Sequence, residues 1–222
     1  MNLLLVTALT IQGLYYMANK CKLAIFDMDG VLVESASIHT KALRKSIAAL
    51  VSIEASQERF LDASDGIRTK DKLKRLAASY GLSNIEIKAI DELKERLTIE
   101  ALVALPINSM LVETLTELKR KGIRLSVGSN SRRVYVDIVI NAIGISHLLD
   151  YSVAGDEVDN PKPHPEIFKR SIEYLGYSPN ETVIFEDSSI GIEAAAKTGS
   201  IVIIVDSSSG VTKEQLLFCV NR

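Results

Sequence analysis

The chain has 222 residues, 47% of them hydrophobic and 24% charged, a composition that excludes an intrinsically disordered protein. Its 26 basic and 28 acidic side chains give a formal charge of −2. This balance argues against a dedicated nucleic-acid-binding protein, because such binding depends on neutralising phosphates. The two cysteines, Cys21 and Cys219, make neither a disulfide framework nor a zinc site, so we expect a reducing, cytoplasmic location.

Residues 1–19 form an uncharged and mostly apolar leader, for which three interpretations stay open. A signal peptide needs a positive first region and a small-residue cleavage site, and the segment has neither pattern. A disordered or membrane-associated leader is the second interpretation; a stable membrane span is not expected, since about 20 apolar residues are needed. The third is that translation starts at Met17, directly before the first strand.

Beyond the leader, five short apolar runs bounded by turn residues predict buried β-strands. These runs are residues 22–27, 123–128, 151–154, 182–186 and 201–205. Helical patterns precede the last four runs, over residues 109–121, 132–142, 165–175 and 189–198, and another spans 212–220. Such alternation predicts an α/β fold with a parallel sheet that is covered by helices on both faces.

Residues 36–106 interrupt this alternation and predict an inserted α-helical cap domain. They contain four helical patterns, over about 37–52, 55–63, 69–80 and 84–104. The catalytic core would then consist of residues 20–35 and 107–222. Ligands of open α/β sheets bind outside the carboxyl ends of the strands, so an insertion after the first strand is expected to cover the active site.

Acidic and polar residues follow the predicted strands at their carboxyl ends, namely Asp27 and Asp29, Ser129 and Asn130, Lys162, and Glu186 and Asp187. Parallel strands would bring these groups to one edge of the sheet. Clustered carboxylates repel one another unless a cation neutralises them. Oxygen-only ligands favour Mg²⁺, which often works with a substrate phosphate, and lysine and serine side chains can hold the remaining phosphate oxygens.

These four groups resemble, in order and approximate spacing, the four motifs of the haloacid dehalogenase superfamily. The matching segments are Asp27-x-Asp29-Gly30, Ser129-Asn130, Lys162-Pro163 and Glu186-Asp187-Ser188. The resemblance extends over about residues 22–206. It is strongest to the phosphatase and β-phosphoglucomutase-like branch, and it implies a Rossmann-like parallel sheet core with a four-helix cap.

The resemblance implies a Mg²⁺-dependent phosphatase that acts on a small phosphorylated metabolite, a sugar or polyol phosphate. Asp27 would be the nucleophile that forms an aspartyl-phosphate, and Asp29 the general acid and then the base. An acid at the position of Asp29 points to phosphate esters. Ser129, Asn130 and Lys162 would bind phosphate, and the metal ligands would be Asp27, the backbone carbonyl of Asp29, Glu186 and Asp187.

Four further residues are candidates for substrate or cap contacts. Ser35 and His39 have the spacing seen in β-phosphoglucomutase-like proteins, although His39 could equally be a helix-surface residue. Arg68 could be a second anion anchor, but the mutases have arginine one place later, where this chain has Thr69. Arg132 could contact substrate or lie in solvent at the start of a helix.

Two other functions stay open, a β-phosphoglucomutase-like isomerase and a non-catalytic phosphometabolite-binding protein. We expect no nucleic-acid partner, and a monomer or weak dimer.

Overall fold

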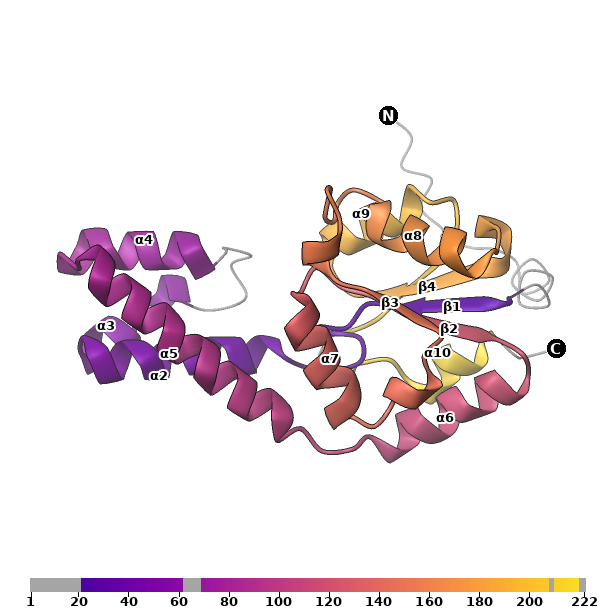
Figure 1. Cartoon of the computed structure of the whole chain (residues 1–222), viewed down its shortest axis with the longest axis horizontal. Coiled ribbons are helices and arrows are strands. Elements are labelled where there is room, and N and C mark those ends of the chain that lie inside the picture. The colour runs from indigo at the N-terminus through magenta and orange to yellow at the C-terminus, as the bar shows by residue number, and fades with distance from the viewer. Residues whose placement is uncertain (1–20, 62–68, 208–209, 220–222) are drawn as a thin grey trace. The chain divides into compact units, whose positions relative to one another are not determined.

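The computed structural model describes residues 21–61, 69–207 and 210–219 (Figure 1). These residues divide into two compact units: residues 34–106 form one, and the residues before and after them form the other, the core unit. The expected leader, residues 1–19, and the candidate anchor Arg68 lie outside the described residues. Among the described residues, no helix combines the length and apolar character that a bilayer crossing requires.

The core unit contains a five-stranded sheet in the order β3-β2-β1-β4-β5, in which every neighbouring pair is parallel. Its strands are β1 (Leu23–Phe26), β2 (Arg124–Gly128), β3 (Tyr151–Val153), β4 (Thr182–Glu186) and β5 (Ile201–Ile204). In this register Phe26 lies between Val127 and Phe185. The carboxyl ends of β1, β2 and β4 therefore lie side by side, which confirms the predicted parallel α/β core.

Helices cover both faces of the sheet, with α8 and α9 on one face and α6 and α10 on the other (Figure 1). The core-unit helices are α6 (Ser109–Arg120), α7 (Arg133–Ala142), α8 (Glu166–Leu175), α9 (Ser189–Ala196) and α10 (Lys213–Leu217). Single 3₁₀ turns occupy Ser146–Leu148, Gly155–Glu157 and Pro179–Glu181. All four residues of β1 are buried, as expected for a central strand covered on both faces.

The residue pattern explains why helix and strand alternate here. In α6 the buried residues Leu111, Leu115 and Leu118 recur at helical spacing, and the Asn108 side chain accepts a hydrogen bond from the Leu111 N–H as the N-cap. On the α8 and α9 face, Leu23 and Ile25 of β1 belong to the same buried cluster as Phe168 of α8. Alternation along β1 thus places every second side chain on this face.

The unit of residues 34–106 is helical and has its own core. It contains α2 (Ala36–Leu50), α3 (Ile53–Ser56), a 3₁₀ turn (Arg59–Leu61), α4 (Thr69–Tyr80) and α5 (Asn84–Val103). Helices α2 and α5 pack together, and Leu43, Ile47, Leu76 and Ile90 are among the buried residues.

The helix expected over 55–63 is wrong for its described residues. A four-residue helix ends at Ser56, and a separate 3₁₀ turn follows. The guanidinium of Arg44 explains the break, because it donates hydrogen bonds to the backbone oxygens of Ser56 and Glu58. A side chain from α2 thus satisfies carbonyl groups at the helix end that would otherwise need partners.

Candidate active site

The loop after β1 carries Asp27 and Asp29 and makes a tight turn at Gly30. The Gly30 N–H donates to the Val33 carbonyl at 2.8 Å, and Gly30 has a φ of +90°. A Cβ atom at this position would lie 2.1 Å from Oδ2 of Asp187. Only glycine combines this backbone conformation with so close an approach, and the turn therefore brings the β1 loop against the β4 loop.

A buried lysine joins the acidic ends of two strands. The side chain of Lys162 is 2% exposed, and its Nζ donates to Oδ1 of Asp27 and, at 2.7 Å, to Oε1 of Glu186. The same Nζ lies 4.6 Å from the ring centroid of Phe168. Burial alone would lower the pKa of Lys162, but the two carboxylates outweigh it and raise the pKa above its ordinary value. The lysine therefore stays charged.

Glu186 is fully buried and is the most heavily hydrogen-bonded carboxylate of the site. Its Oε2 accepts from the backbone N–H groups of Asp187 and Ser188, at 2.8 and 2.9 Å, and from the Ser188 hydroxyl at 3.1 Å. A Cβ on Gly191 would lie 1.7 Å from Oε1 of Glu186. The first turn of α9 is therefore shaped around this carboxylate, which holds both its own loop and Lys162.

Three carboxylates at the strand ends fit a small divalent cation. Asp27, Glu186 and Asp187 each offer one oxygen within 4.8 Å of the others. With Lys162 as counterion, the formal charge of these four groups is −2. In the described part of the chain, Oδ1 of Asp187 is buried and has no hydrogen-bond partner, an arrangement that is unfavourable unless another group binds there. Oxygen-only ligands and this charge are those that Mg²⁺ prefers.

The pKa shifts of these acids reflect the same crowding. Burial raises the pKa of Asp27 to about 7, although the Lys162 ammonium opposes the shift. Burial also raises the pKa of Asp187, and the neighbouring Glu186 charge adds to the effect. Additional positive charge at this edge of the sheet would favour the ionised carboxylates.

Two serines from the loop after β2 approach Asp29. The Ser131 hydroxyl donates to Oδ2 of Asp29 at 2.7 Å, whereas Oγ of Ser129 is 3.5 Å from that oxygen. The Ser131 N–H donates to Oγ of Ser129 at 3.0 Å, so the two serines support each other. Ser129 is buried next to the predicted catalytic residues. Ser131 was not predicted, because a loop serine outside a recognised motif gives no signal in one sequence.

Asn130 joins two loops of the site through its side-chain amide. Its Oδ1 accepts from the Lys162 N–H at 2.9 Å, and its Nδ2 donates to the Lys162 carbonyl at 3.3 Å. This pair of hydrogen bonds gives Asn130 a structural role in holding the backbone that carries the buried lysine. Its predicted contact with phosphate stays a prediction.

The other described substrate candidates lie at the starts of two helices. Arg132 is the exposed N-cap residue of α7, and it donates to the Tyr135 hydroxyl at 3.0 Å and lies over the Tyr135 ring. Ser35 is buried at the N-cap position of α2, and His39 lies in the first turn of that helix. Ser35 and His39 belong to the helical unit, and the substrate contacts of all three stay predictions.

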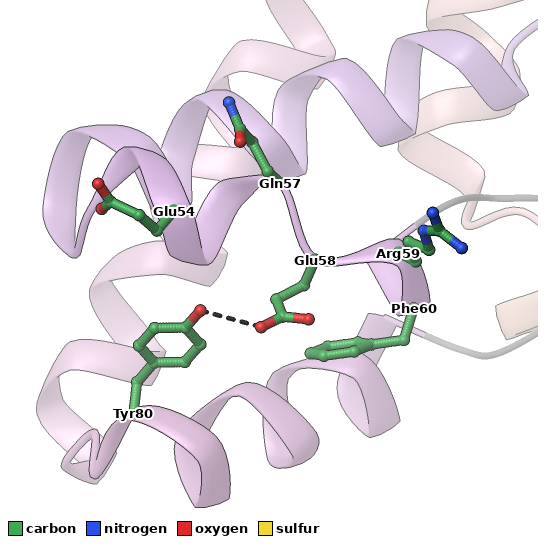
Figure 2. A pocket seen from close by; sticks show the side chains of 6 residues that line it. All are labelled: Glu54, Gln57, Glu58, Arg59, Phe60 and Tyr80. Atoms are coloured by element: carbon green, nitrogen blue, oxygen red, sulfur yellow. Dashed lines mark hydrogen bonds between the residues drawn. The ribbon is translucent and has the colours of Figure 1, made fainter.

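The helical unit also contains an open hollow (Figure 2) lined by Glu54, Gln57, Glu58, Arg59, Phe60 and Tyr80. Figure 2 shows the Tyr80 hydroxyl pointing to Glu58, and it donates to Oε1 of that residue at 2.9 Å. None of the predicted catalytic residues lines this hollow. Two carboxylates against one arginine make it unsuited to a phosphate, so the strand-end cluster is the better candidate.

Comparisons with known proteins agree with this geometry. A family model described as haloacid dehalogenase-like hydrolase matches residues 24–205. Protein CbbY of Rhodobacter capsulatus is 28% identical over 84% of this chain and 86% of its own length. A phosphorylated carbohydrates phosphatase of Thermotoga maritima is 29% identical over 79% of this chain and 80% of its own. The crystal structure of CbbY from Rhodobacter sphaeroides in complex with phosphate has a TM-score of 0.65 at 25% identity, covering 83% of this chain and 85% of that one.

Proposed function

Since the chain belongs to the haloacid dehalogenase-like hydrolase family and is a phosphatase, we propose that it hydrolyses monophosphate esters of small sugars or polyols and depends on Mg²⁺. The observation that carries this proposal is the buried Lys162 ammonium, which contacts Asp27 beside a cluster of three carboxylates. The cluster supplies a nucleophile, a counterion for phosphate and a set of oxygen ligands within one small volume.

Asp27 is the proposed nucleophile because its carboxylate lies at the end of the central strand, next to Lys162. One carboxylate oxygen attacks phosphorus as the ester oxygen leaves, which gives an aspartyl-phosphate. Asp29 donates a proton to the leaving oxygen in this step. Water then attacks the phosphoryl group, Asp29 takes up the water proton, and phosphate leaves to regenerate the Asp27 carboxylate.

The chain's other residues would bind and neutralise the transferred group. The Ser129 hydroxyl and Lys162 would bind phosphate oxygens. Mg²⁺ would be held by the carboxylates of Asp27, Glu186 and Asp187 and the backbone carbonyl of Asp29. When bound, the cation would neutralise charge on the phosphoryl group.

The substrate class is inferred from the relatives. One is named a phosphatase of phosphorylated carbohydrates, and the Lys162 ammonium provides a counterion for an anionic phosphoryl group. A panel of sugar and polyol phosphates, assayed by release of inorganic phosphate, tests the class. If β-glucose 1-phosphate primed with a sugar bisphosphate gave glucose 6-phosphate faster than it gave phosphate, the protein would be an isomerase instead.

The mechanism is tested by hydrolysis of p-nitrophenyl phosphate. We expect turnover that requires added Mg²⁺ and is abolished in Asp27→Asn, while Asp137→Asn, on the exposed side of α7, leaves it unchanged. Turnover that survives in Asp27→Asn, or in the presence of a chelator, would contradict the mechanism. Metal binding without turnover of any phosphate ester would identify a binding protein.

A further inference from the structure

We propose that Ser131 is a positioning residue that orients the Asp29 carboxylate for proton transfer to the leaving group. The inference rests on the proposed function, in which Asp29 is the general acid. Its basis is the hydrogen bond from the Ser131 hydroxyl to Oδ2 of Asp29, at 2.7 Å. This is well within the normal range for a hydroxyl donor and a carboxylate.

Two hydrogen bonds hold the backbone of Ser131 in place. Its N–H donates to Oγ of Ser129 at 3.0 Å, and its carbonyl accepts from the Gly155 N–H at 2.8 Å. The loops approach so closely that a Cβ on Gly155 would lie 2.2 Å from the Asn130 carbonyl oxygen. The hydroxyl is therefore presented from a part of the core unit that packing has fixed.

Asp29, in contrast, lies close to the point where the chain leaves the core unit. Residues after Val33 belong to the helical unit, and Asp29 makes an isolated bridge with Val33 itself. The Ser131 hydroxyl makes the shorter of the two serine contacts with Oδ2 of Asp29, and it comes from the loop after the neighbouring strand β2. A well-oriented acid is what proton transfer requires.

The hydroxyl is expected to matter only when the leaving group needs a proton. Phenyl phosphate and p-nitrophenyl phosphate have nearly the same shape, but p-nitrophenolate leaves readily without protonation and phenolate does not. The constant kcat/KM reports the steps up to leaving-group departure, so it isolates the acid role of Asp29 from its later role as base. We expect Ser131→Ala to lower kcat/KM about 10-fold for phenyl phosphate and less than about 3-fold for p-nitrophenyl phosphate.

Two controls separate this role from a structural one. Ser131→Thr retains a hydroxyl, and Ser131→Val introduces a side chain of the same shape as threonine but without the hydroxyl. Only the valine variant should therefore show the selective loss of kcat/KM for phenyl phosphate. Ser200→Ala removes a buried hydroxyl that has no hydrogen-bond partner in the described chain and lies next to the amino end of β5. This variant should leave kcat/KM unchanged for both phenyl phosphate and p-nitrophenyl phosphate.

Two results would overturn the inference: an equal loss on both aryl phosphates, or threonine and valine variants that behave alike. In an Asp29→Asn background, Ser131→Ala should have no further effect, and an additive loss would show that Ser131 acts elsewhere. The Asp29→Asn variant alone tests the proposed function. If Asp29→Asn lowers kcat/KM equally for both aryl phosphates, the proposed acid role of Asp29 is wrong. If Asp29→Asn is selective for phenyl phosphate and Ser131→Ala is not, only the positioning role of Ser131 is wrong.

Discussion

Replacing Lys162 by methionine tests the charge balance of the site directly. Methionine retains most of the apolar stem but removes the ammonium that lies over the Phe168 ring and between Asp27 and Glu186. The formal charge of the four groups then changes from −2 to −3 in a site where the lysine side chain is 2% exposed. We expect the metal-free variant to be strongly destabilised at neutral pH.

The magnitude follows from the distances. At 2.7 Å, the attraction between Nζ and one Glu186 oxygen is about 6 kcal/mol for an effective dielectric constant of about 20. Desolvation of the buried ammonium offsets several kcal/mol of this. Removing one partner of a buried pair typically lowers the free energy of unfolding by about 3–5 kcal/mol, because the other charge stays buried, and we expect a loss in that range.

Chemical denaturation at pH 7 in the presence of a chelator measures the loss. Added Mg²⁺ should then stabilise the variant more than the wild type, because the site of the variant is more negative. At 100 times its dissociation constant, a ligand that binds only the folded state adds about 2.7 kcal/mol. The matched control is Lys169→Met, at an exposed position of α8, which should change stability by less than about 0.5 kcal/mol.

A loss of unfolding free energy below about 1 kcal/mol in metal-free Lys162→Met would contradict a buried and paired ammonium at this position, because removing such a charge typically costs about 3–5 kcal/mol. Equal stabilisation of variant and wild type by Mg²⁺ would refute the charge argument for the cation site.

Three further predictions concern the core unit. Gly30→Ala should abolish turnover and lower the unfolding free energy by about 1–3 kcal/mol, because its Cβ would collide with Asp187. The control is Gly122→Ala, since Gly122 has a φ of +82° but no atom lies within 4 Å of the new Cβ. This variant should lose only about 1 kcal/mol of unfolding free energy and stay active. Asp150→Asn should destabilise the protein near neutral pH, and the difference from the wild type should shrink as pH falls below about 3.9, as measured by denaturation over a range of pH. Burial would raise the pKa of Asp150, but hydrogen bonds led by that from Lys119 keep this pKa below its ordinary value. The ionised carboxylate therefore stabilises the fold above the unfolded pKa of about 3.9. This stabilisation is lost as pH falls through the pKa of the folded state. Chelation of the metal should lower the melting temperature of the wild type but not that of Asp187→Asn, as followed by calorimetry; equal shifts in both would contradict a ligand role for Asp187.

The core fold could be predicted because its signals are local. Each strand is a short apolar run next to a turn, and several helices of the core unit begin or end at a residue with a clear preference, such as Asn108 before α6 or Gly176 after α8. The predicted family and the parallel sheet were both confirmed, because their signals are also local. Each motif is a short segment that follows one predicted strand.

Contacts between distant segments could not be predicted in this way. The break after α3 depends on Arg44, which reaches carbonyl groups 12 and 14 residues later. The amide of Asn130 holds the backbone of Lys162, and the Ser131 hydroxyl reaches Asp29 across 102 residues of chain. These roles come from side chains whose partners are set by the tertiary fold. One sequence identifies the residue types but not their neighbours.

The position of the helical unit in the sequence also affects the order in which the protein can fold. Leu23 of β1 pairs with Arg124 of β2, so the central strand pair closes a loop of about 100 residues, most of which lies in residues 34–106. A contiguous helical segment with its own apolar core can become compact through local contacts, which form quickly. Once compact, it leaves about 30 flexible residues in the loop and reduces the entropy cost of closure by about 1 kcal/mol. We therefore expect the insertion to act as a folding nucleus that speeds formation of the strand pair bearing Asp27 and Ser129.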